Sequence, residues 1–117
     1  MRTLRISSRY EQGDIVILEL PFTDLLGTKL RPVLVLNAAD LGEDLIVAKI
    51  TSTPGKHRIP ITQTDLATGK LKKEPSYIDC SAIFTVEKKL VIKTAGKLTP
   101  NALTKVKQEL KTILGLQ

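Results

Sequence analysis

A series of short apolar runs, each bounded by turn residues, constrains the fold of this chain most strongly. Residues 15–20, 31–36 and 45–50 are rich in Ile, Val and Leu, and Gly, Pro or Asn residues stand between them. Short β-branched runs with flanking turn signals are typical of strands. We also predict strands at 77–84 and 90–92, and an edge strand at 58–62 that contains Pro60. Residues 64–74 show no periodicity and are expected to form an exposed loop.

An amphipathic helix is predicted at the end of the chain, over residues 99–115. Thr99 is suited to the N-cap, Pro100 to the first helical position and Gly115 to the residue that ends the helix. Residues 1–12 resemble a basic arm, or a short first strand. With no internal repeat or linker, residues 1–117 are expected to form one mainly β domain, a small barrel or strongly twisted sheet of five to seven strands that the helix covers.

The composition limits the classes of function. Eighteen Lys and Arg residues against 12 acids give a net charge of +6, which fits a polyanion binder but also simple solubility. Aromatic residues make up 3%, too few for a base-stacking surface. One cysteine and one histidine cannot form a disulfide or a Cys/His metal site, and the isolated glycines form no phosphate loop. We expect no cofactor and no metal. Because no signal peptide or membrane-spanning run is present, we expect a cytoplasmic protein.

Arg31 and Thr51 are the first candidates for chemistry. Arg31 stands at the mouth of the second predicted strand, in which Pro32 can be the first residue, and Thr51 ends the third. If these strands are antiparallel, the two side chains are neighbours, and a guanidinium with a hydroxyl is suited to a phosphodiester. The alternative is that Arg31 caps a carbonyl or pairs with Asp24, and that Thr51 and Ser52 merely begin a turn.

Motifs along most of the chain resemble the MazF/PemK-like toxin family. The matching segments are Gly13-Asp14-Ile15-Val16, Pro21-Phe22-Thr23-Asp24, Lys29-Leu30-Arg31-Pro32-Val33-Leu34-Val35-Leu36, Ile50-Thr51-Ser52, Pro75-Ser76-Tyr77-Ile78, Phe84-Thr85-Val86, Lys97-Leu98-Thr99 and Leu114-Gly115-Leu116.

The resemblance implies an SH3-like barrel, a homodimer and an endoribonuclease that cuts single-stranded RNA without a metal, leaving a 2′,3′-cyclic phosphate. It also implies an acidic cognate antitoxin, with which the toxin binds DNA. The family's catalytic arginine matches Arg31 and its catalytic threonine matches Thr51, and the loop at 23–29 is expected to gate the site. The candidate RNA-binding residues are Asp24, Lys29, Ser52, Thr53, Lys56, His57 and Arg58.

Two departures from the family and several alternatives stay open. Some members carry a glutamate in the loop before the arginine; here Asp24 is the only acid, so the general base is unassigned. Asp79 stands where many relatives have a basic residue, which favours a structural or subunit-contact role for that strand over phosphate binding. His57 is an acid/base group, an RNA contact or, as its place on a basic turn favours, a solvent-exposed side chain, and Cys80 is expected to be buried. The competing functions are a non-catalytic nucleic-acid-binding module and a protein-interaction barrel.

Overall fold

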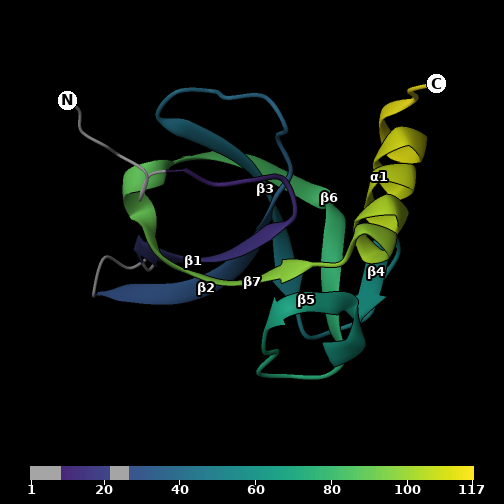
Figure 1. The fold of residues 1–117 in the computed structure, drawn as a ribbon, viewed down its shortest axis with the longest axis horizontal. Helices are drawn as coiled ribbons and strands as arrows, with labels where there is room; N and C mark the ends of the chain where they lie inside the picture. The colour runs from purple at the N-terminus through teal and green to yellow at the C-terminus, as the bar shows by residue number, and fades with distance from the viewer. Residues whose placement is uncertain (1–8, 22–26) are drawn as a thin grey trace.

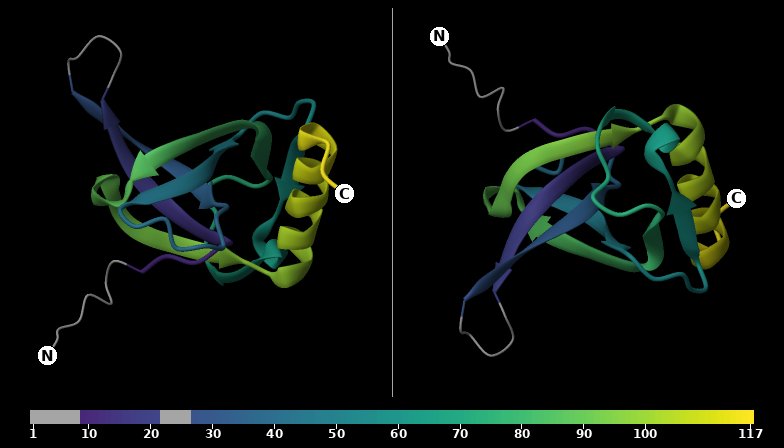
Figure 2. Two further views of the ribbon diagram at one scale, coloured as in Figure 1. Left: turned by 90° about the horizontal axis from the view of Figure 1, so that it is seen from above. Right: turned by 90° about the horizontal axis from the view of Figure 1, so that it is seen from below.

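The computed structural model describes residues 9–21 and 27–117 of the chain (Figure 1). Its described part holds seven strands in one antiparallel sheet, in the order β4-β6-β3-β2-β1-β7-β5, and one α-helix. The sheet is strongly curved but does not close into a barrel (Figure 2). The elements are β1 (Asp14–Pro21), β2 (Thr28–Val35), β3 (Asp44–Thr51), β4 (Arg58–Ile61), β5 (Leu66–Gly69), β6 (Ser76–Glu87), β7 (Val91–Leu98) and α1 (Pro100–Leu114).

The predicted mainly β class, the early strands and the helix are confirmed. The edge position of β4, which contains Pro60, is confirmed as well. The prediction of a loop at 64–74 is wrong, because a 3-10 turn at Gln63–Asp65 leads into β5. The predicted strand at 90–92 is too short, because β7 continues to Leu98 after a 3-10 turn at Lys88–Leu90. Of the predicted arm at 1–12, residues 1–8 lie outside the described part of the chain.

Two apolar clusters lie on opposite faces of the sheet. One contains Leu34, Ile78 and Val106, and it fills the space between the sheet and α1. The other contains Leu18, Val33 and Val47 and lies on the inner side of the curve. Successive strand residues point to opposite faces, so each strand of β1, β2 and β3 contributes to both clusters. Burial on both faces explains why these strands read as nearly continuous apolar runs.

The helix α1 begins and ends where its sequence predicts. Thr99 Oγ1 accepts a hydrogen bond from the N–H of Ala102 at 3.2 Å, Pro100 is the first helical residue, and Gly115 adopts the left-handed conformation with φ 70°. Val106 is fully buried against the sheet. The helix packs on β6, β4 and β7, and it lies far from the end of β1 and the start of β2 (Figures 1 and 2).

Pro32 lies inside β2, and not at its first residue as the sequence allows. The strand begins at Thr28, and Pro32 pairs with Ile17 of β1. The pairing of β2 with β3 ends at Val33, directly after this proline. A proline has no N–H to donate to a neighbouring strand, which fits an end of the ladder at this point. The first half of β2 therefore pairs with β1 alone, and its residues 28–31 are exposed.

Candidate active site

Arg31 and Thr51 lie just beyond the last pair of the ladder that joins β2 and β3. The printed pairs run from Val35 with Val47 to Val33 with Lys49. The ladder ends there, and the same register extended by two residues on each strand would align Arg31 with Thr51. Arg31 is exposed and Thr51 is half-buried. Because the pairing ends at Val33 and Lys49, the proximity of Arg31 and Thr51 stays a prediction.

Strand alternation places both residues on the inner face of the sheet. Arg31 shares its face with Val33, and Thr51 shares its face with Val47; both valines belong to the inner cluster. Directly opposite residues in adjacent strands also share a face. Thr51 pairs with Tyr77 of β6, so this tyrosine continues the row. The inner face thus changes from an apolar core to a polar surface as β2 and β3 approach Arg31 and Thr51.

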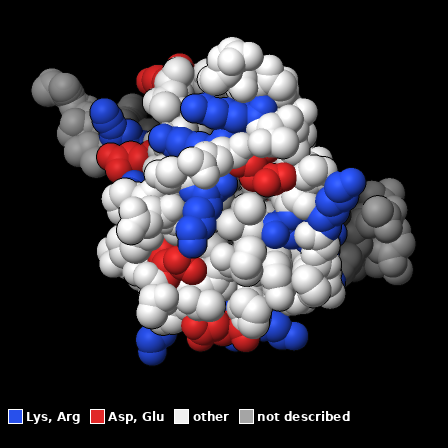
Figure 3. Space-filling model, turned by 90° about the vertical axis from the view of Figure 1, so that its right-hand side faces the viewer, with Lys and Arg blue, Asp and Glu red and all other residues white. Residues whose placement is uncertain are grey.

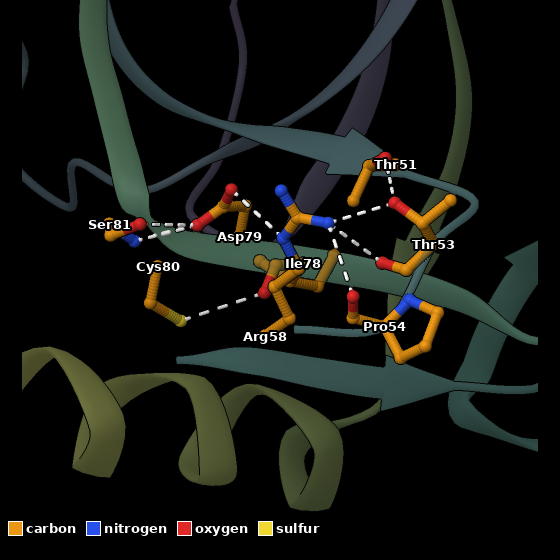
Figure 4. A network of polar contacts seen from close by, with 8 residues as sticks. All are labelled: Thr51, Thr53, Pro54, Arg58, Ile78, Asp79, Cys80 and Ser81. Carbon is orange, nitrogen blue, oxygen red and sulfur yellow. Dashed lines mark hydrogen bonds and ion pairs between the residues drawn. The ribbon is translucent and has the colours of Figure 1, made fainter. Parts of the chain in front are cut away.

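The next row holds an ion pair that links β4 to β6. Lys49 pairs with Asp79, and Asp79 pairs with Arg58. Arg58 Nε donates to Asp79 Oδ2 at 3.1 Å (Figure 4). The same carboxylate accepts hydrogen bonds from the N–H and hydroxyl of Ser81, at 3.0 Å and 2.7 Å. Asp79 is only 5% exposed, and it therefore has a structural role rather than a phosphate-binding one.

The pKa of Asp79 reflects two opposing effects. Burial acts to raise the pKa of the carboxyl, because it penalises the charged form. The hydrogen bonds from Ser81 and the ion pair with Arg58 outweigh burial, so the pKa lies below its ordinary value. Asp79 is consequently ionised at neutral pH and holds Arg58 in place.

Arg58 reaches from this ion pair to the turn that follows β3. Its Nη1 donates to the carbonyl of Thr53 at 3.0 Å and to Thr53 Oγ1 at 2.9 Å, with a longer contact of 3.5 Å to the carbonyl of Pro54. Thr53 Oγ1 lies 3.5 Å from Thr51 Oγ1. Figure 4 shows these side chains in one connected network. Arg58, which the sequence suggests as an RNA contact, is therefore held by protein atoms.

His57 is not the freely exposed side chain that the sequence favours. Its side chain is 34% exposed, and Nδ1 lies 2.6 Å from Oε2 of Glu109 on α1. The residue has a positive φ of 63°, which is uncommon outside glycine, and its carbonyl accepts from the N–H of Cys80 at 3.0 Å. His57 therefore fastens the loop between β3 and β4 to the helix.

The remaining candidates are not among the residues of the network in Figure 4. Lys29, Ser52 and Lys56 are exposed, while Asp24 and the gate predicted at 23–29 lie largely outside the described residues. Cys80 is buried as predicted, and burial, followed by the charges of Glu109 and Asp79, raises its pKa to about 11.

Surface charge is mixed on the side of the molecule that carries α1. Lys and Arg side chains alternate there with Asp and Glu, and no single basic patch covers that side (Figure 3). A surface pocket of about 400 Å³ is lined by residues such as Tyr10, Asn37 and Lys88 and by none of the candidate residues. Across the described residues, no three His, Cys, Asp or Glu side chains gather as a metal site would require. No helix in that part of the chain is long and apolar enough to cross a membrane.

Comparison with known proteins identifies the family. Residues 11–114 match the sequence profile of the PemK-like, MazF-like toxins of type II toxin–antitoxin systems. The chain belongs to this family. No curated protein sequence matches it significantly. This PemK/MazF-like toxin has the mainly β fold that the sequence predicts. Its backbone is similar to those of solved toxins, although the sequence identity is low.

Several solved structures share the fold at low sequence identity. An endoribonuclease in complex with its cognate antitoxin, from a mycobacterial species, has a TM-score of 0.70 and 19% identity over 92% of this chain and 95% of its own. MazF from a MazE-MazF structure of Deinococcus radiodurans has a TM-score of 0.70 and 17% identity over 92% and 97%. The Mycobacterium tuberculosis toxin MazF-mt6 has a TM-score of 0.65 and 19% identity over 87% and 98%.

The link between Arg58 and Asp79 is the feature of this PemK/MazF-like site that sequence reasoning missed. Both residues were noted separately, Arg58 as an RNA contact and Asp79 as a departure from the family. A signal was available, because a basic residue in an edge strand and an acid in a neighbouring strand often pair across a sheet. The register needed to choose this pair is not readable from the sequence.

Proposed function

We propose that the protein is a metal-independent, sequence-specific endoribonuclease that acts as the toxin of a toxin–antitoxin pair. Its substrate is single-stranded RNA, and the reacting phosphodiester binds between Arg31 and Thr51. The observation that supports the proposal is the register of β2 and β3, whose last pair is Val33 with Lys49 and whose extension by two residues would align Arg31 with Thr51. The family supports the same reaction class, since related structures are named endoribonucleases.

The chemistry follows from the donors that this site offers. The 2′-hydroxyl of the RNA attacks the neighbouring phosphorus, the O2′–P bond forms and the P–O5′ bond breaks, which leaves a 2′,3′-cyclic phosphate. The 2′-hydroxyl proton passes to solvent water, and the leaving 5′-oxygen takes a proton from water. Arg31 stabilises the charge that develops on the phosphoryl oxygens, because a guanidinium stays charged at every relevant pH. The Thr51 hydroxyl donates to a phosphoryl oxygen and orients the group.

An acidic antitoxin and a second copy of the chain are the proposed protein partners. Two of the related structures contain a toxin together with its antitoxin. The net charge of +6 suits an acidic partner that competes with RNA for the inner face, and the paired proteins would then bind DNA as a complex. We propose a homodimer by the same family argument.

Cleavage of a long single-stranded RNA in EDTA tests the activity. We expect wild-type protein to cut at discrete sites, and Arg31→Ala and Thr51→Ala to lose roughly a hundredfold or more in rate, as expected for removal of a preorganised donor. Lys105→Ala, which removes a charge from an exposed position of α1, is the matched control and should cut like wild type. Uncut RNA, or equal rates for wild type and Arg31→Ala, would refute the proposal.

A modified substrate tests the chemistry separately. Once a cut site is mapped, a short RNA with a single 2′-deoxynucleotide on its 5′ side lacks the attacking hydroxyl. We expect this RNA to bind but to stay intact, while the unmodified RNA yields a 2′,3′-cyclic phosphate end. Cleavage of the deoxy-substituted RNA would show that water, rather than the 2′-hydroxyl, is the nucleophile.

A further inference from the structure

A chain of polar contacts connects a buried carboxylate of β6 to the hydroxyl of Thr51. It runs from Asp79 to Arg58, from Arg58 to Thr53 Oγ1 at 2.9 Å, and from there to Thr51 Oγ1 at 3.5 Å (Figure 4). The last contact is long for a hydrogen bond between hydroxyls. Catalytic hydrogen bonds are often long in unliganded sites and shorten when the substrate binds.

The direction of the hydrogen bonds in this chain is fixed at its Arg58 end. A guanidinium can only donate, so Thr53 Oγ1 must accept from Arg58. The proton of the Thr53 hydroxyl is then available for Thr51 Oγ1. When Thr51 accepts it, the proton of Thr51 is left to donate to a bound phosphate. Either hydroxyl can be the donor in the contact between Thr53 and Thr51, but a hydroxyl that accepts from a cation is a better donor, so Arg58 favours donation from Thr53 to Thr51.

The Arg58 side chain is suited to this task because it is held at both ends. Asp79 is buried and keeps Nε in place, while Nη1 also donates to the carbonyl of Thr53. A planar guanidinium can hold a carboxylate and the turn after β3 at once, whereas a lysine ammonium is a single point charge. The contacts therefore fix the backbone of the turn as well as the orientation of its hydroxyls.

From this geometry we infer that Arg58 and Thr53 are positioning residues for the proposed ribonuclease: they orient the Thr51 hydroxyl so that it donates to the scissile phosphate. The inference rests on the proposed function of Thr51. It assigns Arg58 a role different from direct phosphate binding, because its Nε and Nη1 are already used by Asp79 and Thr53.

Thr53→Val gives the cleanest test, because it removes the hydroxyl and leaves the ion pair of Arg58 and Asp79 in place. The variant also loses the hydrogen bond from Arg58 to Thr53 Oγ1, while Arg58 keeps its bond to the carbonyl of Thr53. We expect kcat to fall about fivefold to tenfold, with KM unchanged. Thr53→Ser keeps a hydroxyl and should restore wild-type kcat. Thr85→Val, at an exposed position of β6, is the matched control.

A double-mutant cycle distinguishes positioning from a general structural effect. On a Thr51→Ala background, Thr53→Val should not lower the rate further, because it acts only through Thr51. Arg58→Lys keeps the positive charge, so a positioning role predicts lower kcat with unchanged KM and unchanged salt dependence of RNA binding. A raised KM with a smaller salt slope would show that Arg58 binds phosphate directly and overturn the inference.

The outcomes separate the two proposals. If wild-type protein does not cut RNA, or if Thr51→Ala is fully active, the proposed function fails. If wild type is active and Thr51→Ala is not, but Thr53→Val cuts at the wild-type rate, only the positioning role is refuted. A loss in Thr53→Val that persists undiminished in the Thr51→Ala background would refute it as well.

Discussion

Replacing Asp79 by asparagine tests how far the buried ion pair stabilises the fold. The carboxylate accepts from Ser81 through Oδ1 and from Arg58 through Oδ2. An asparagine can keep its carbonyl oxygen toward Ser81, but its amide N–H groups then face the Nε–H of Arg58. The substitution therefore removes one charge-assisted hydrogen bond and sets two donors against each other.

The cost can be worked out from this geometry. A hydrogen bond between charged groups contributes about 1.5–3 kcal/mol. The Arg58 side chain is 25% exposed, so water compensates part of the loss. We expect Asp79→Asn to lower the free energy of unfolding by about 2 kcal/mol. For a domain of this size, that corresponds to a fall of about 8 °C in the melting temperature.

The pH dependence gives the decisive measurement, since the pKa of Asp79 is lowered in the folded protein. A lowered pKa contributes stability that is fully present above the ordinary value of 3.8 and is lost as the pH falls through the folded value. Thermal unfolding followed by circular dichroism from pH 7 to pH 2 should therefore show wild type and Asp79→Asn converging in acid.

A matched variant and two results complete this test. Asp44→Asn removes the same charge from an exposed position of β3 and should change stability by less than about 0.5 kcal/mol. Equal melting temperatures of wild type and Asp79→Asn at pH 7 would refute the stabilising role of the ion pair. A difference that stays the same at pH 2 would refute its assignment to the ionised carboxylate.

Three further predictions concern the glycine crossing, the helix cap and the buried thiol. Gly69→Ala should lower the free energy of unfolding by about 3 kcal/mol or more, because the added Cβ would lie 2.1 Å from the carbonyl oxygen of Ala95 at a backbone φ of +90°. Gly42→Ala has nothing within 4 Å of the added Cβ and should lower it by about 1 kcal/mol. Equal losses of the two variants in urea unfolding would contradict this prediction. Thr99→Ala should lose about 1 kcal/mol through the N-cap bond and Thr99→Ser should not, and no loss in Thr99→Ala would show that the cap is not stabilising. Cys80, buried with a pKa of about 11, should resist alkylation at pH 8 until the protein is unfolded in denaturant, and rapid labelling of native protein would show that the thiol is accessible.

Local sequence signals predicted those elements that local interactions determine. The apolar runs at β1 and β3 and the caps of α1 depend on periodicity and on single residues such as Thr99 and Gly115. The short strand β5 was missed because its residues carry no alternating apolar pattern. It forms because it pairs with β7, where Gly69 and Gly96 allow the two backbones to approach closely.

In the candidate site, too, some residues were identified from the sequence, whereas their contacts were known only from the fold. The sequence by itself identified Arg31 and Thr51 as strand-end residues suited to a phosphodiester, and it favoured a structural or subunit-contact role for the strand of Asp79. Only the tertiary structure decided that Arg58 belongs to Asp79 and Thr53 and that His57 contacts Glu109. The physical reason is that strand register and the docking of α1 are set by cooperative packing of distant segments. A one-residue change in register would send a strand residue such as Arg58 or Asp79 to the opposite face of the sheet.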